Sequence, residues 1–267
     1  MTIEKKLLGT SPSGGATDVA EVFSTHLYTG NNTTNVINNG IDLAGKGGFV
    51  WLKSRSAAGS GSIFDTIRGR AYNFQTAEAS FADTFAANAG VTSFNSNGFS
   101  LGVGSYGSTN GNNVTYASWT FRKKEKFFDI VTYTGNGSAR TISHGLNGPV
   151  GMILIKRISG TGNSNWETFH RGQGPTKSGR LNNNTAFSNN ASGGYWNSTA
   201  PTNSVFSIGT DGGVNSNGQT YIAYLFADNS SEDAEDQMIK CGSYTGTGSN
   251  LDVNLGWEPQ FLLIKNS

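Results

Sequence analysis

The sequence has little charge, one cysteine and few prolines. Of its 267 residues, 14% are Asp, Glu, Lys or Arg, five are proline, and the net charge is +1. The single cysteine, Cys241, excludes an internal disulfide. A net charge near zero attracts neither nucleic acid nor an anionic membrane. We therefore expect no nucleic-acid partner.

Long apolar runs are also missing. No stretch reaches the length of a membrane-spanning helix, and the opening MTIEKKLLGTSPSGG carries no secretory signal pattern. These two absences predict a protein that is synthesised in a cytoplasm and does not insert into a membrane.

Glycine, asparagine and aromatic residues are abundant instead. The chain has 37 glycines and 29 asparagines, and 11% of its residues are aromatic. Disordered chains are poor in aromatics, whereas many short strands joined by Gly and Asn turns fit this composition. The composition therefore predicts an all-β fold.

A short phrase occurs three times along the chain. LYTGNN begins at Leu27, YTGNGS at Tyr133 and SYTGTG at Ser243. The spacing is 105 residues between the first two tyrosines of the phrase and again between Tyr116 and Tyr221, in VTYASWTF and QTYIAYLF. Internal periodicity of this kind indicates repeated structural units. We divide the chain into an N-terminal arm (1–18), two repeats (19–126 and 127–237) and the start of an incomplete third (238–267).

Further landmarks suggest what each repeat folds into. FVWLKS (49–54), MILIKR (152–157) and FLLIKN (261–266) are continuous apolar runs ending near a lysine, typical of buried strands. With the turn-rich segments between them, they predict tandem β-sandwich domains of about 105 residues. One segment, 75–90, is alanine-rich and predicts a short helix in the first repeat.

The third repeat contains its first two apolar runs only. A β-fold interrupted there would expose an unpaired strand edge. We expect that the natural polypeptide is longer, or that these strands complete a neighbouring domain or chain.

No catalytic or metal site can be assigned from the residues. His26, His144 and His170 have no cysteine or carboxylate at metal-ligand spacing. FDTIRG (64–69) and WETFHRG (166–172) each contain a carboxylate and an arginine, which we interpret as structural pairs. We expect no enzyme, no metal and no cofactor.

Carbohydrate binding stays open, because sugars are held by aromatic faces beside polar groups. The second repeat supplies such groups in its loops: Trp166, Arg171, Tyr195, Trp196 and Asn197. The alternative is that both tryptophans are core anchors of a small sandwich.

Several motifs together resemble a known family. EKKLLGT, VFSTHLYTGN, NGIDLAGKGGFVWLKSR, FDTIRG, FNSNGFSLG and WNSTAPTNSVFSIG, followed by NSNGQTYIAYLFA, look like the repeated domain of structural proteins from marine tailed bacteriophages, especially cyanophages. The strand pattern is also similar, more weakly, to jelly-roll or concanavalin A-like lectin sandwiches. The first repeat departs from the pattern, with SWTFRKK where the second has AYLFADN.

The resemblance implies a virion protein, most simply a tail fibre or tail-associated subunit that presents its repeats toward the host surface. It implies docking through the N-terminal arm, with other virion proteins of the tail, adaptor or nozzle as partners. The residues expected to dock are Ile3, Lys5, Lys6, Leu7 and Leu8. A homo-oligomer, such as a trimer, and a host surface glycan are further expected partners. The alternatives are a capsid decoration or head-fibre protein, and a glycan-binding lectin or depolymerase.

Overall fold

The computed structural model describes residues 18–79, 83–104, 109–160, 164–189, 193–230 and 237–266. Its strands form antiparallel sheets, and its helices are single turns: α1 (Val19–Val22), α2 (Leu43–Lys46) and α3 (Gly212–Asn215). An aspartate caps the N-terminus of each turn by accepting a backbone N–H. The expected all-β fold is confirmed, whereas the helix expected over 75–90 does not form in the described residues of that span.

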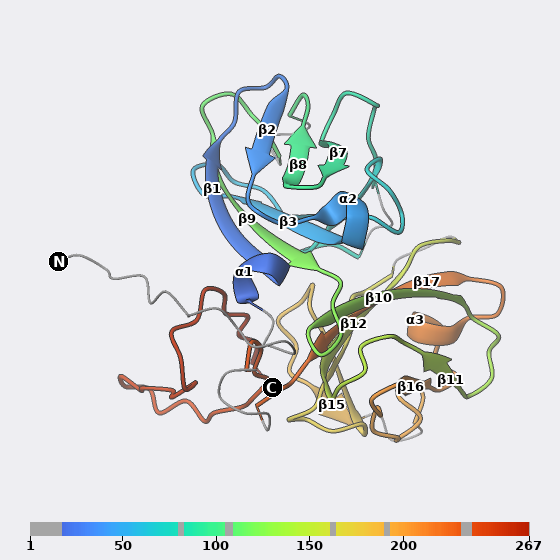
Figure 1. Cartoon of the computed structure of the whole chain (residues 1–267). Helices are drawn as coiled ribbons and strands as arrows, with labels where there is room; N and C mark the ends of the chain where they lie inside the picture. The colour runs from blue at the N-terminus through green and yellow to red at the C-terminus, as the bar shows by residue number, and fades with distance from the viewer. Residues whose placement is uncertain are drawn as a thin grey trace, which may run out of the picture.

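Two six-stranded sheets dominate the molecule (Figure 1). The first consists, in spatial order, of β1 (Phe23–Thr29), β9 (Thr115–Arg122), β3 (Gly48–Ser54), β4 (Ser62–Asp65), β5 (Tyr72–Gln75) and β6 (Asp83–Thr84). The second consists of β10 (Phe128–Thr134), β17 (Thr220–Ala227), β12 (Val150–Arg157), β13 (Glu167–His170), β14 (Lys177–Arg180) and β15 (Ser188–Asn189). In each large sheet, the strand that comes last in sequence is inserted between the first two: β9 lies between β1 and β3, and β17 lies between β10 and β12.

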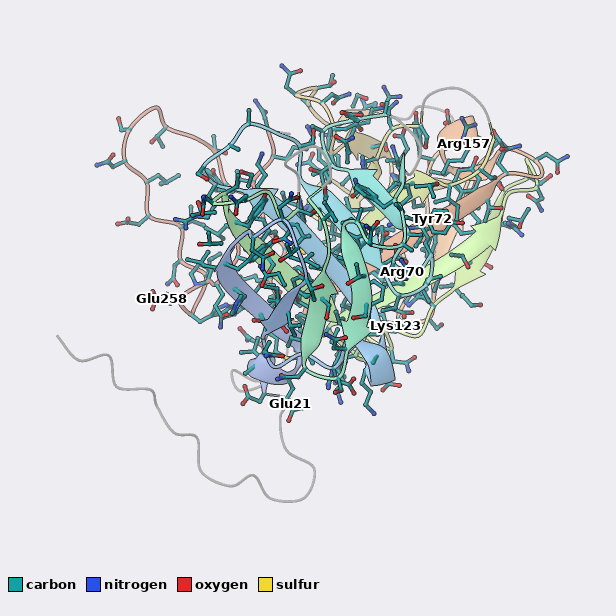
Figure 2. All side chains as sticks on the ribbon, turned by 90° about the horizontal axis from the view of Figure 1, so that it is seen from above. Glu21, Arg70, Tyr72, Lys123, Arg157 and Glu258 are labelled. Atoms are coloured by element: carbon teal, nitrogen blue, oxygen red, sulfur yellow. The ribbon has the colours of Figure 1, made fainter. Side chains whose placement is uncertain are left out.

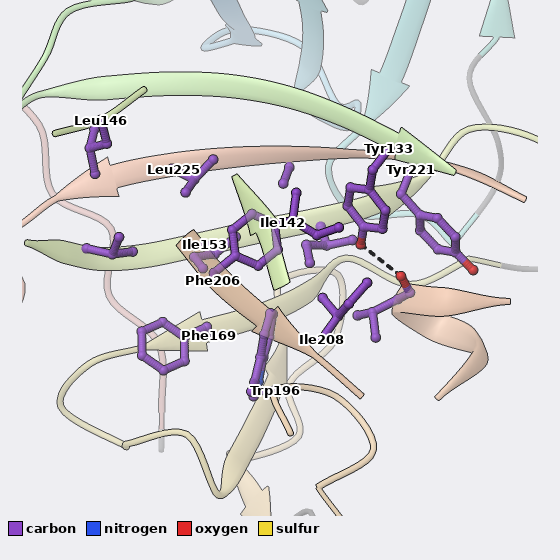
Figure 3. Packing of buried hydrophobic residues seen from close by; sticks show 14 of the residues in the cluster. Tyr133, Ile142, Leu146, Ile153, Phe169, Trp196, Phe206, Ile208, Tyr221 and Leu225 are labelled. Carbon is purple, nitrogen blue, oxygen red and sulfur yellow. Dashed lines mark hydrogen bonds between the residues drawn. The ribbon is translucent and has the colours of Figure 1, made fainter. Parts of the chain in front are cut away.

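A smaller sheet covers one face of each large sheet. In the first half of the chain it contains β2 (Asn35–Asn38), β8 (Gly98–Leu101) and β7 (Val91–Asn95); in the second half it contains β11 (Arg140–Ser143) and β16 (Val205–Ile208). Because side chains alternate across a strand, Val50 and Leu52 of β3 face the first small sheet. Ile153 and Ile155 of β12 face the second, where they pack with Phe206 and Trp196 (Figure 3).

The other faces of the two large sheets pack against each other. Phe49 and Phe121 of the first half share one buried cluster with Phe128, Tyr224 and Phe226 of the second. Ring centroids are 5.0 Å apart for Phe49 and Phe128 and 5.4 Å apart for Phe121 and Phe226. Each fully buried aromatic side chain stabilises the fold by roughly 1.5–3 kcal/mol. The layers therefore run small sheet, large sheet, large sheet, small sheet, and the two halves form one body.

The repeated phrase makes the same contacts in both halves. Tyr28 stacks on Tyr116 with ring centroids 5.0 Å apart, and Tyr133 stacks on Tyr221 at 5.2 Å. The Tyr28 hydroxyl donates to a loop carbonyl, Thr109 O, at 2.5 Å. Tyr133 donates likewise to Val214 O at 2.8 Å (Figure 3).

A buried asparagine completes each of these loops. Asn110 Nδ2 donates to Gly102 O at 2.6 Å, and its Oδ1 accepts from the Asn31 amide at 3.1 Å. Asn215 repeats the pattern 105 positions later, with Gly209 O at 2.7 Å and the Asn136 amide at 2.9 Å. We call each set of tyrosines and asparagine (Tyr28, Tyr116 and Asn110; Tyr133, Tyr221 and Asn215) a loop clamp.

The glycine of the phrase is required by space. A Cβ added at Gly30 would lie 2.2 Å from Gly111 O, and one added at Gly135 would lie 2.2 Å from Ser216 O. The phrase is therefore explained by packing of the fold, since its tyrosine, its glycine and the backbone amide of its asparagine all hold one loop against the sheet.

The third copy of the phrase makes no such clamp. Tyr244 is 51% exposed, and the described residues 237–266 contain no strand, contrary to the expectation for FLLIKN. Strands β3 and β12 each have a partner strand on both sides, β4 and β9 or β13 and β17. Among the described residues, no strand pairs with 261–266.

Candidate functional site

A buried ion pair lies where the two halves meet. Asp65, at the end of β4, is fully buried and accepts a 2.5 Å hydrogen bond from Arg68 Nε. It also accepts a 2.7 Å bond from the hydroxyl of Tyr224 in the other half. The Arg68 guanidinium lies 3.5 Å from the ring centroid of Phe74. The expected pair of Asp65 and Arg68 beside an aromatic ring is confirmed, and it joins the halves.

A buried lysine makes a second polar contact across the junction. Lys156, on β12, is completely buried, and its Nζ donates to the carbonyls of Ser164 and, at 3.3 Å, Glu78. Glu78 belongs to the first half and Ser164 to the second. Burial lowers the pKa of Lys156 to about 8. This contact is structural, since its partners are backbone carbonyls.

Two of the five residues considered for glycan binding are buried. Trp166 is 0% exposed, and its Nε1 donates to Gln75 O of the first half at 3.2 Å. Trp196 is 1% exposed in the core of the second half, with its ring centroid 5.6 Å from that of Phe169 (Figure 3). Neither indole can present a face to a sugar, so assigning them to a glycan site is wrong and the core-anchor alternative holds.

The other three candidates lie nearer the surface but have separate partners. Arg171 pairs with Asp228 at 2.7 Å, with 44% of its side chain exposed. Tyr195 is half-buried, and its hydroxyl accepts from Arg180 at 3.4 Å. Asn197 is exposed, with φ at 51° in the left-handed region. The contacts of Arg171 and Tyr195 thus lead to different side chains.

Arg180 organises a polar cluster that the sequence did not reveal. Its Nε donates to the buried Glu167 carboxylate at 3.3 Å, while its terminal nitrogen reaches Tyr195. Burial raises the pKa of Glu167 to about 7, against the lowering effect of Arg180. Asp211 also contributes to the field at Glu167. A guanidinium that is 42% exposed beside a phenol can donate hydrogen bonds to a polar ligand.

This cluster corrects the pairing expected for the second repeat. Glu167 is bonded to Arg180 and Arg171 to Asp228, so Glu167 and Arg171 are not partners. The motif WETFHRG contains no signal for Arg180, which lies on β14 and reaches Glu167 through strand pairing. Only the three-dimensional register brings the two together.

The histidines occupy three unrelated places. His26 lies on β1, His144 is buried and stacked against Phe206, and His170 ends β13. Burial lowers the pKa of His144 and of His170. Among the described residues, no three His, Cys, Asp or Glu side chains gather to hold a metal ion.

The C-terminal segment (237–266) encloses a cavity. A space of about 970 Å³ lies between this segment and both halves, with walls that include Phe23, Trp51, Phe121, Met152 and Leu154. Phe261 packs over Trp119 at a centroid distance of 5.4 Å. Four residues further on, Lys265 donates to Thr185 O at 2.8 Å. Cys241 is part of this wall, and burial raises the pKa of its thiol to about 12, which keeps it unreactive.

The surface shows an uneven distribution of apolar side chains. Exposed large apolar residues of the first half are Leu27, Val36, Ile67, Tyr72 and Val103, and those of the C-terminal segment are Tyr244, Leu251, Val253, Leu262, Leu263 and Ile264. The described residues of 127–230 contain none. Charged side chains are spread over the surface, as Figure 2 shows for Glu21, Lys123, Arg157 and Glu258.

The docking residues expected in the N-terminal arm (Ile3, Lys5, Lys6, Leu7 and Leu8) lie outside the described residues. Within the part of the chain that is described, no helix has the length and apolar character to cross a membrane.

Comparison with known proteins gives one match. Residues 18–267 match a family described as "Domain of unknown function (DUF7483)". No curated protein and no solved structure matches the chain.

Proposed function

We propose that this chain is a non-enzymatic virion structural protein, a tail fibre or tail-associated subunit. The chain belongs to the DUF7483 family, and two observations support the proposal. The resemblance of its motifs to repeated domains of marine phage structural proteins is one support. The structure contributes a second, which concerns how the two halves are joined.

Both halves are proposed to be copies of one β-sandwich of about 105 residues. The two large sheets have the same strand order, and the loop clamps recur at a constant spacing. The correspondence of Tyr28 with Tyr133, and of Asn110 with Asn215, supports this reading at the level of single atoms.

The observation that carries the proposal is the shared aromatic core between the large sheets. Phe49, Phe121, Phe128 and Phe226 bury one sheet face against the other, and the Asp65–Tyr224 bond crosses the same junction. Two domains joined in this way cannot swing independently, unlike domains connected by a polar, wet interface. Such a unit suits a protein that holds a fixed spacing within a particle.

Immunogold labelling of purified particles of the encoding phage tests the proposal. An antibody against the folded chain should label tails, and mass spectrometry of gradient-purified particles should detect the chain. Labelling of the capsid would replace the tail assignment by the decoration or head-fibre alternative. Absence of the chain from washed, infectious particles would refute a virion role altogether.

A glycan-binding function is the second candidate, because a specific cluster favours it. Arg180 and Tyr195 combine hydrogen-bond donors with an aromatic ring in the second half. A glycan array probed with the whole chain, followed by calorimetry on any hit, tests this directly. Tyr195→Ala should abolish binding, and Tyr244→Ala, at an exposed tyrosine of the C-terminal segment, should preserve it; equal binding by both variants would contradict a site at Tyr195.

A further inference from the structure

Strand β1 is the long open edge of the first large sheet. It has β9 as its sole neighbour in the sheet, and in Figure 1 it lies at the margin of the upper half. The opposite edges, β6 and β15, are only two residues long, which is a usual protection against pairing with another chain. The seven residues of β1, FSTHLYT, include no Asp, Glu, Lys, Arg or Pro.

The corresponding edge of the second half is protected differently. Strand β10 carries the buried Asp129, which pairs with Lys123 at 3.0 Å and accepts the Gly145 amide at 2.7 Å. An inward charge and a loop held against the strand both hinder edge-to-edge pairing. Strand β1 has no charge at the equivalent place, Ser24. The C-terminal segment touches its edge through one side-chain bond, from Thr25 Oγ1 to Gln260 O at 3.2 Å, which leaves the outward backbone amides of the strand without a partner among the described residues.

At alternate residues of β1, the backbone N–H and C=O groups point away from β9 toward the open edge. Gly30 N donates to Val114 O at the β9 side, so with a period of two, residues 28, 26 and 24 also face β9. Thr25, Leu27 and Thr29 therefore point their amides and carbonyls away from the sheet. Thr29 O already accepts from Asn35 Nδ2 at 3.2 Å. Within the described residues, the outward backbone groups of Thr25 and Leu27 have no bonding partner.

The side chains of this edge are apolar or neutral. Leu27 is 57% exposed, and Thr25 and Thr29 beside it on the same face are exposed as well. This edge belongs to the first half, which with the C-terminal segment carries all exposed large apolar side chains among the described residues. The uneven apolar surface and the open backbone are separate observations, and both mark the first half as the side of contact.

We propose that β1 pairs with β1 of a second copy of this chain, antiparallel across a two-fold axis. One strand suffices for such an interface, because a two-fold axis places the same edge against itself in antiparallel orientation. With the axis at His26, Leu27 of each copy lies opposite Thr25 of the other. Their outward amides and carbonyls then bond across the axis, and the two first large sheets become one continuous sheet.

A second copy fits this edge better than a charged partner does. Strand β1 has no Asp, Glu, Lys or Arg to attract one, and the residues that meet at the axis are His26 and its copy, flanked by Thr25 and Leu27. The pairing also satisfies the exposed backbone of both chains at once. The inference is independent of the proposed virion role, because it concerns the isolated chain.

Sedimentation equilibrium of the whole chain, from about 1 to 100 µM, tests the proposal over the affinity range of weak dimers. We expect the wild type to be dimeric at the upper end. Leu27→Lys places one positive charge per copy beside the axis, so two like charges come close in the dimer. We expect the dissociation constant of the dimer to rise by at least about tenfold. The matched control is Thr132→Lys, at the equivalent exposed position of β10, which should dimerise as the wild type does.

Circular dichroism distinguishes lost pairing from lost folding in these variants. Leu27 is exposed, so Leu27→Lys should keep the wild-type spectrum and melting temperature. Thr25→Pro removes an outward amide without adding charge, a change that edge strands tolerate, and should also weaken the dimer. A wild type that stays monomeric at the highest concentration would overturn the proposal. So would an oligomer that survives Leu27→Lys as well as it survives Thr132→Lys.

Discussion

The two halves of the molecule keep the same loop clamp but differ at the face where they meet. In the first half, Asp65 lies opposite Phe49 on β3 and carries the buried ion pair of the junction. In the second half, the place opposite Met152 on β12 is taken by His170, while the carboxylate of Glu167 lies opposite Ile155 and faces the other side of the sheet.

This difference separates two kinds of constraint on the sequence. The tyrosines and asparagine of the clamp, and the glycine of the repeated phrase, serve the fold of each half, so both halves need them. The buried carboxylates have different tasks: Asp65 serves the junction and Glu167 serves the interior of the second half. Their positions therefore differ between the halves. Mutations in the two classes should therefore behave differently, and four predictions follow from the strongest expected effect to the weakest.

Removing the charge of Asp65 should have the largest effect. Asp65→Asn leaves the Arg68 guanidinium buried without its counter-charge, and we expect the free energy of unfolding to fall by ~3–5 kcal/mol. Urea denaturation measures the loss. Glu21→Gln, in an exposed pair with Arg122 at 3.8 Å, should cost less than about 1 kcal/mol. Equal losses in the two variants would contradict a stabilising role for the buried Asp65–Arg68 pair.

The buried Glu167 should make stability depend on pH. Because the folded state raises its pKa from 4.5 to about 7, its stabilising contribution is complete below pH 4.5 and is lost as pH rises through 7. Relative to Glu167→Gln, the wild type should lose up to ~3 kcal/mol across this window. Urea titrations at several pH values measure the difference. Glu258→Gln, at an exposed position, should keep the wild-type slope, and parallel curves for wild type and Glu167→Gln would contradict the prediction.

The clamp asparagines should be equivalent in the two halves. Asn110→Ala and Asn215→Ala each leave buried carbonyls and amides unpaired, and each should cost ~1–3 kcal/mol. The exposed Asn217→Ala is the control, with an effect within about 0.5 kcal/mol. Chemical denaturation compares all three. A large cost in one half alone would mean that the clamp is structural only there.

The smallest effects concern the tyrosine hydroxyls. Tyr28→Phe and Tyr133→Phe each lose one hydrogen bond to a loop carbonyl and should cost about 1 kcal/mol. Tyr244→Phe, in the third copy of the phrase, should leave the melting temperature unchanged because that side chain is half exposed. A measurable loss from Tyr244→Phe would indicate that the third phrase also forms a clamp.

The sequence predicted what depends on neighbouring residues and missed what depends on strand register. The runs FVWLKS and MILIKR were expected to be buried strands, and most of their residues are buried in β3 and β12, because each large sheet is covered on both sides. The partner predicted for Glu167, Arg171, was wrong, because the actual partner, Arg180, comes from another strand. The helix expected over 75–90 does not form in the described residues of that span, where Phe85 packs on Phe64 of the sheet.

The candidate site was predicted only in part for the same reason. Tyr195, Arg171 and Asn197 lie on the loops expected to carry polar contacts, and whether they bind a glycan stays a prediction. The burial of Trp166 follows from the packing of one half on the other, which no local pattern encodes. Its indole faces Phe74 of the first half, far away in sequence.

The position of the last strand in each half determines when that half can fold during synthesis. Strand β9 lies between β1 and β3, so the first strand has no lasting partner until nearly the whole half has left the ribosome. Contacts so distant in sequence slow folding, because a long loop must close before they form. Until then the aromatic strands are exposed to neighbouring nascent chains. We therefore expect each half to fold late and in one step, and its yield in the cell to depend more on the pace of translation than on final stability.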